Sequence, residues 1–194
     1  MCKNEKIPSI AITNRHQVEG DYLEQIKIVA KQRPDSIILR EKDLPANEYE
    51  ELAKQVIPIG KKYQVPVFLH YYVDVAKKLG VTNIHVPFLI LQNMTSKEKD
   101  LFLQIGASIH SVEEAMEAQK QGATRLIAGH IFETSCKPGL SPRGLDFLRK
   151  VCQSVTIPVY AIGGITDKNA KECIMAGTKG VCMMSAFMKK DKQF

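Results

Sequence analysis

The residues best suited to chemistry are concentrated in one segment, Gly129–Leu140, which reads Gly-His-Ile-Phe-Glu-Thr-Ser-Cys-Lys-Pro-Gly-Leu. The segment directly follows the apolar run Arg125–Ala128, which is typical of a β-strand. It therefore supplies a histidine at a strand end, a hydroxyl, a lysine and a glycine-bearing loop. Since histidine titrates near neutral pH, these groups could move a proton on a small anionic substrate.

Two cations follow another apolar run, in the segment Leu39-Arg40-Glu41-Lys42-Asp43. Arg40 and Lys42 share a face if the extended geometry continues, and together they could clamp a phosphate or carboxylate. An exposed charged turn leading into Pro45 would have the same residues, so both interpretations stay open.

Three other strand ends carry polar side chains. His70 could be a second acid or base, could orient the substrate, or could be a hydrogen-bonded structural histidine. His85 lies between two apolar residues, and this setting favours a packing role. Ser108 could donate to an anion, whereas His110 and Ser111 are typical of residues that enter a helix.

These positions depend on short apolar runs that alternate with longer helical patterns. The predicted strands are 9–13, 36–40, 65–70, 83–86, 105–108, 125–129, 158–163 and 180–184. The predicted helices are 21–32, 48–62, 73–79, 96–103, 112–121, 142–153 and 167–176. Ser111 and Glu114 predict a capping box for one helix, and Asp167 is the predicted start of another.

Eight strands with intervening helices predict the α/β class and a closed (β/α)8 barrel rather than an open sheet. The 194 residues fit one small barrel domain covering 1–194. In such a barrel the carboxyl ends of the strands face one cavity, so these polar strand ends are expected to converge there.

The ends of the last two strands predict a phosphate site. Paired glycines, Gly163 and Gly164, let a backbone approach a ligand closely. Met184 and Ser185 lead into the last predicted helix, whose first amides favour an anion. Because barrels commonly bind phosphate between the loops of strands seven and eight, we predict a phosphate bound by Gly163, Gly164 and Ser185. Met184 belongs to the same predicted substrate-binding set.

Carboxylates that could hold Mg²⁺ are scarce near the strand ends. The segment 87–95 after strand four has no acidic residue, and Asp74 falls inside a predicted helix. Glu41, Asp43 and Glu133 remain, but they do not obviously converge. We therefore expect no metal and no cofactor.

Composition and charge narrow the remaining function classes. The net charge of +6 fits a mixed solvated surface or attraction of a phosphorylated small molecule. Without a basic run interleaved with aromatic residues, nucleic-acid binding is not expected. The five cysteines are scattered, and there is no apolar run of membrane-spanning length, so we expect a cytoplasmic protein with reduced thiols.

Several segments together resemble the thiamin phosphate synthase superfamily. They are Arg40–Asp43, Val73–Ala76, Ala161–Ile165 and the glycine-rich end, within a similarity from about Ile10 to Phe187. The resemblance implies a (β/α)8 fold that acts on thiazole and pyrimidine phosphates, and it suggests a homodimer. The apolar segment 88–91 is expected to be a loop that serves as an interface or a lid.

Within this superfamily, two features favour the thiazole tautomerase (TenI-like) branch. His70 and Tyr71 stand where synthases typically have an Asn-Asp pair that helps to hold magnesium. Gly129–Thr134, followed by Cys136 and Lys137, also looks like the tautomerase segment. This resemblance implies metal-free aromatisation of a carboxythiazole phosphate, an isomerase reaction in which His130 transfers the proton.

The resulting prediction is a tautomerase with His130 as acid or base, assisted by His70. The phosphate would lie at the paired glycines, and the carboxylate near Arg40, Lys42, Thr134 or Lys137. Two alternatives stay open. One is a magnesium-dependent thiamin phosphate synthase, which the cations permit. The other is a non-enzymatic binder, either a thiazole-phosphate sensor or a regulator of gene expression that acts through a partner.

Overall fold

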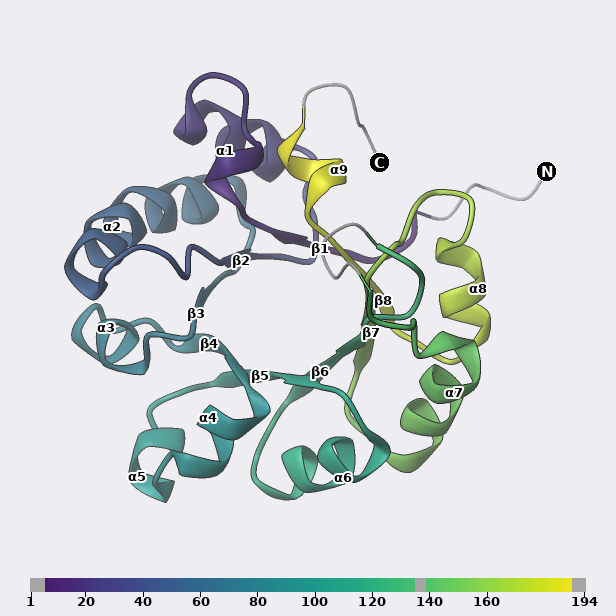
Figure 1. Ribbon diagram of the computed structural model, residues 1–194. Coiled ribbons are helices and arrows are strands. Elements are labelled where there is room, and N and C mark those ends of the chain that lie inside the picture. Colours follow the sequence, from purple (N-terminus) through teal and green to yellow (C-terminus); the bar gives the residue numbers. More distant parts are fainter. Residues whose placement is uncertain (1–5, 135–138, 190–194) are drawn as a thin grey trace.

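The computed structural model describes residues 6–134 and 139–189, which form a closed barrel of eight parallel strands. Each strand pairs with the next along the chain, and β8 pairs with β1 to close the ring (Figure 1). The predicted (β/α)8 barrel is thus confirmed, and every predicted strand forms with ends shifted by two residues at most. The strands are β1 (Ser9–Ile12), β2 (Ser36–Leu39), β3 (Val67–His70), β4 (Asn83–Pro87), β5 (Gln104–Ile109), β6 (Arg125–Gly129), β7 (Val159–Ile162) and β8 (Gly180–Met183).

Helices surround the ring of strands on the outside (Figure 1). Asp21, Thr95 and Ser111 each begin a helix by accepting a hydrogen bond from a backbone N–H three residues later. The helices are η1 (Arg15–Gln17, a 3-10 helix), α1 (Tyr22–Lys31), α2 (Ala46–Tyr63), α3 (Val73–Lys78), α4 (Phe88–Asn93), α5 (Ser96–Lys99), α6 (Val112–Lys120), α7 (Gly144–Ser154), α8 (Ala170–Met175) and α9 (Ser185–Met188). Within the described ranges, no helix has both the length and the apolar character needed to cross a membrane.

The strands are apolar on both faces because each face packs into a separate core. Side chains that alternate along the strands fill the inside of the barrel, among them Ile10, Ile38, Phe68, Ile127 and Cys182. A larger core lies between the strands and the helices. The inner core is small, which leaves the ends of the barrel to polar side chains.

The segment 88–91 is a helix rather than the predicted loop. It forms the first part of α4, which starts directly after β4 with Pro87 as its N-cap. Leu91 is fully buried, whereas Leu89 is 68% exposed. The sequence prediction failed because this short helix lacks a polar cap and an alternating polar face. Its burial of Leu91 stabilises it instead.

Two other predicted helices differ in their ends. The helix predicted for 96–103 ends at Lys99, because the backbone N–H of Leu103 already donates to the carbonyl of Thr82. The helix predicted from Asp167 begins at Ala170. Asn169 has its side-chain oxygen on the backbone N–H of Thr166, which holds this connection in a turn before the helix.

Candidate active site

The carboxyl ends of β2 to β5 bring several predicted site residues to one half of the barrel mouth. His70 at the end of β3 is in register with His85 on β4, and their rings stack 5.9 Å apart. His85 is buried, as its apolar neighbours indicated, but packing is only part of its role. Its Nε2 lies 2.8 Å from Oγ of Ser108 on β5, so the pair forms a polar contact inside the barrel.

His70 lies beside the two cations that follow β2. Burial lowers the pKa of His70 to about 3, and the positive charges of Lys42 and Arg40 act in the same direction. The ring is therefore neutral at neutral pH and accepts a proton poorly, which favours an orienting role over that of a general base. The neighbouring cations make this side of the mouth suitable for an anion.

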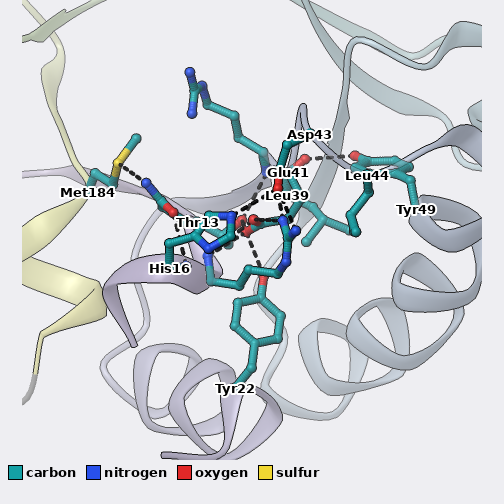
Figure 2. A network of polar contacts seen from close by, with 12 residues as sticks. Thr13, His16, Tyr22, Leu39, Glu41, Asp43, Leu44, Tyr49 and Met184 are labelled. Atoms are coloured by element: carbon teal, nitrogen blue, oxygen red, sulfur yellow. Dashed lines mark hydrogen bonds and ion pairs between the residues drawn. The ribbon is translucent and has the colours of Figure 1, made fainter. Parts of the chain in front are cut away.

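A buried carboxylate fixes the chain just after Arg40 (Figure 2). Glu41 is 2% exposed and accepts hydrogen bonds from Thr13 Oγ1 at 2.7 Å, from the backbone N–H of Arg15 at 3.1 Å and from the Tyr22 hydroxyl at 3.2 Å. The same Thr13 oxygen accepts from the backbone N–H of Arg40 at 2.9 Å. The end of β2 is thus tied to the segment after β1.

The second acidic residue of this segment is also paired. Asp43 accepts hydrogen bonds from the Arg15 guanidinium at 2.7 Å and from His16 at 2.9 Å. These bonds, that from Arg15 above all, hold the pKa of Asp43 well below its usual range. Since Arg15 also contacts Glu41 at 3.2 Å, one arginine joins both carboxylates.

Tyr49 of α2 positions the ends of β2 and β3 from outside the barrel. Its hydroxyl donates to the carbonyl of Leu39 at 2.7 Å and accepts from the backbone N–H of His70 at 2.8 Å. The tyrosine is fully buried. A single side chain therefore holds the backbone at the points where Arg40 and His70 enter the mouth.

The residues of the described part of the mouth do not fit a magnesium ion. Mg²⁺ is usually held by one or two carboxylates together with substrate phosphates. Glu41 and Asp43 are already engaged by the groups around Arg15, and Glu133 is exposed on the loop after β6. In residues 6–134 and 139–189, no three His, Cys, Asp or Glu side chains are grouped as metal ligands.

The predicted acid or base His130 follows β6 and is 6% exposed. Its Nε2 donates to the carbonyl of Leu140 at 3.2 Å, and its Cβ packs against the backbone of Gly163. Thr134 is half-buried in the loop that follows. Lys137 lies outside the described residues, so this half of the mouth is described only in part.

The local backbone structure explains why two glycines follow β7. Gly163 and Gly164 adopt φ values of 101° and 65°, which side-chain-bearing residues rarely adopt. A Cβ on Gly163 would lie 2.3 Å from Cβ of His130, and one on Gly164 would lie 2.3 Å from the carbonyl oxygen of Glu133. Close packing of the β6 loop therefore requires both glycines, whether or not a phosphate binds there.

The last strand leads into the short helix α9. Ser185 is the first residue of α9, which has four residues and therefore only a small dipole. Met184 lies against the 3-10 helix, with its sulfur 3.6 Å from Nδ2 of Asn14 and 3.6 Å from Nε2 of Gln17. The predicted roles of Met184 and Ser185 in substrate binding stay predictions.

Two features of the barrel were missed from the sequence. Glu41 organises the chain around Arg40, although the sequence indicated only an anion clamp by its neighbours or an exposed charged turn. Arg125, at the start of β6, points into the barrel and is 7% exposed. Arg125 is two residues from Ile127, which fills the inside of the barrel, and this spacing places both side chains on the same face of the strand. The sequence prediction missed it because arginine is mostly found on the surface.

Comparisons with known proteins give one consistent result. A family model described as thiamine monophosphate synthase matches residues 9–187. The thiamine-phosphate synthase of Caldanaerobacter subterraneus is 34% identical over 93% of this chain and 86% of its own length. That of Pyrococcus furiosus is 38% identical over 79% of this chain and 74% of its own length. A solved structure of the thiamine phosphate pyrophosphorylase from Pyrococcus furiosus has a TM-score of 0.80 at 30% identity, covering 95% of this chain and 89% of the other.

These findings correct the function predicted from the sequence. The tautomerase interpretation, an isomerase with His130 as proton carrier, is wrong, because the relatives over most of the chain are named as synthases. The prediction gave too much weight to His70 and Tyr71 and to the segment after β6. The superfamily resemblance itself is confirmed: this chain belongs to the thiamine monophosphate synthase family.

Proposed function

We propose that this protein is a thiamine-phosphate synthase, a transferase that couples a pyrimidine diphosphate to a thiazole phosphate. The names of relatives at 34% and 38% identity support this function. The supporting observation in the structure is the position of Arg40 and Lys42, whose charges both act on the buried His70. This arrangement provides positive charge where a diphosphate would leave.

In this coupling, the thiazole ring nitrogen forms a C–N bond to the methylene carbon of the pyrimidine. The C–O bond between that carbon and the diphosphate breaks, and the electron pair leaves with the diphosphate oxygen. Arg40, Lys42 and Ser108 would stabilise the charge that develops on this oxygen. His70, neutral at neutral pH, would orient the diphosphate without adding charge.

The second substrate would occupy the other half of the mouth. We assign its phosphate to Gly163, Gly164 and Ser185, since barrels commonly bind phosphate between the loops of strands seven and eight. Thr134 follows β6 and would close the space between the two substrates, and Lys137 stays a predicted substrate-binding residue. The predicted partners are thus small phosphorylated molecules.

The family resemblance implies magnesium, which would neutralise diphosphate charge. The described residues do not fit that ion, because the two carboxylates nearest Arg40 are engaged with Arg15. We therefore assign the stabilisation of the diphosphate charge to side chains of this protein and not to a bound magnesium ion.

The test is a coupling assay with both substrates and excess magnesium, which measures thiamine phosphate by chromatography. We expect turnover by the unaltered protein. Arg40→Ala should lower kcat/KM by about 100-fold, because hydrogen bonds from charged donors contribute about 1.5–3 kcal/mol.

Arg149→Ala is the matched control, since Arg149 is an exposed arginine on α7 that pairs with Asp146. Its activity should equal that of the unaltered protein. If the unaltered protein formed no thiamine phosphate, the proposed function would be wrong. Equal activity of the two variants would instead remove Arg40 from the site.

A further inference from the structure

A buried arginine lies inside the barrel, beneath the mouth, and has no part in the coupling described above. The guanidinium carbon of Arg125 is 3.4 Å from the centre of the Phe68 ring, and Nη1 donates to Oγ of Ser36 at 2.9 Å. Burial lowers the pKa of Arg125 to about 10, so the group is charged at neutral pH. Among the described residues, its Nε and Nη2 have no hydrogen-bond acceptor.

His85 of β4 is next to this arginine across β5, because Gly106 is the register partner of both residues. Gly106 marks the contact, because a Cβ there would lie 2.3 Å from Nδ1 of His85 and 3.2 Å from Nε of Arg125. Both nitrogens therefore border the same bare position on β5. The other ring nitrogen, Nε2, is 2.8 Å from Oγ of Ser108, two residues farther along the same face of β5.

The arginine decides which ring nitrogen carries the proton. His85 is neutral, because burial lowers its pKa well below the usual value and nearby positive charges add to this effect. A neutral imidazole has one N–H donor and one acceptor, whereas a guanidinium only donates. The positive charge beside Nδ1 favours the lone pair on that atom, so the proton is on Nε2.

The direction of the next hydrogen bond follows from this tautomer. With its proton on Nε2, His85 donates to Oγ of Ser108, and the serine proton is then available to a ligand in the mouth. With the opposite tautomer, Ser108 would donate to His85 and would turn its lone pairs toward the ligand. A phosphate oxygen requires a donor, so only the first arrangement supports anion binding.

We propose that Arg125 and His85 are positioning residues that make Ser108 a hydrogen-bond donor to the diphosphate. The identity of the ligand rests on the proposed function, whereas the tautomer does not. A purely structural Arg125, packed on the Phe68 ring, would leave the His85 proton and the ligand unaffected.

The first test is nitrogen NMR of protein labelled at histidine, with the His85 signals assigned by their loss in His85→Gln. We expect the proton on Nε2 in the unaltered protein. In Arg125→Met, which keeps the volume and removes the charge, the Nδ1-protonated form should appear, and in Arg125→Lys it should stay minor. A proton on Nδ1 in the unaltered protein, or no change in Arg125→Met, would overturn the proposal.

The second test measures the affinity of inorganic diphosphate by calorimetry. Ser108→Ala and Arg125→Met should each weaken binding about tenfold, the effect of losing one hydrogen bond. The double variant should bind no more weakly than Ser108→Ala alone, because Arg125 acts through the serine. Additive losses would contradict this.

His85→Gln and His85→Leu separate positioning from packing. The glutamine amide can accept from Arg125 and donate to Ser108, so we expect affinity near that of the unaltered protein. The leucine can do neither and should weaken binding about tenfold. Equal affinity of the two variants would overturn the proposal. These measurements need no turnover, so a failed coupling assay would leave their outcome decisive.

Discussion

At the scale of single residues, burial keeps two histidines near the mouth of the barrel, His70 and His85, neutral. His70 is 5% exposed and stacks on His85, while Arg40 and Lys42 supply the positive charge. In the unfolded chain His70 would titrate at its ordinary pKa of about 6.5. Folding is therefore linked to the loss of a proton.

This linkage predicts a loss of stability in mild acid. Below its ordinary pKa, His70 binds a proton in the unfolded chain but not in the fold, where its pKa is about 3. Its contribution is complete above about pH 6.5 and is lost as the pH falls, by about 2 kcal/mol at pH 5. Urea unfolding at about pH 5 and at about pH 7 measures this loss of free energy of unfolding. In His70→Gln the difference between the two pH values should be smaller by about 2 kcal/mol. An unchanged dependence would show that His70 is not buried neutral.

At the scale of elements, the segment after β2 is held by partners from the residue after β1, from η1 and from α1. Glu41 accepts from Thr13, Arg15 and Tyr22, whereas Asp43 is 51% exposed and pairs only at the surface. The two carboxylates are two residues apart, which makes them a matched pair for substitution.

Glu41→Gln should lower the free energy of unfolding by about 3 kcal/mol, since it breaks a buried charge network. Asp43→Asn should lower the free energy of unfolding by clearly less than Glu41→Gln, because exposed ion pairs contribute little to stability. Urea unfolding of both variants measures the difference. Equal losses would mean that Glu41 is not the centre of the network.

The contact between α2 and β3 gives a second prediction at this scale. A Cβ on Gly60 would lie 2.3 Å from Cγ2 of Val67 and 2.7 Å from the carbonyl oxygen of Val65. Gly60→Ala gains about 1 kcal/mol of helix propensity, but overpacking costs about 1–3 kcal/mol, and the backbone oxygen cannot move aside easily. We expect a net loss of stability. Gln55→Ala, at an exposed position of α2, should change stability by less than about 0.5 kcal/mol.

The eight strands could be predicted because runs such as Ile37–Leu39 are buried on both faces and end at polar residues. Helix α4 could not, since its stability comes from the burial of Leu91 in the tertiary structure and not from a local cap. At the site, strand ends indicated Arg40, His70 and Ser108. The contact between Ser108 and His85 joins two strands, and a linear sequence does not give such a contact.

At the scale of the whole molecule, the net charge of +6 should assist the capture of anionic substrates. Raising the ionic strength from about 0.05 M to about 0.3 M should lower kcat/KM several-fold and leave kcat nearly unchanged, because salt screens the approach of the ligand. Steady-state kinetics of the coupling reaction measures both. A kcat/KM that does not depend on salt would show that the overall charge has no part in substrate capture.

The predicted homodimer stays a prediction, which analytical ultracentrifugation can test.

The pairing of β1 with β8, in which Ser9 lies opposite Val181, joins segments that are synthesised far apart in time. Until β8 emerges from the ribosome, β1 and β7 each present an unpaired edge to the surrounding solution. The contacts between β1 and β8 therefore join residues that are far apart in the sequence, and such contacts form slowly in folding. The pairing of the last strand closes the ring. The ring of strands can therefore close only after β8 has been synthesised.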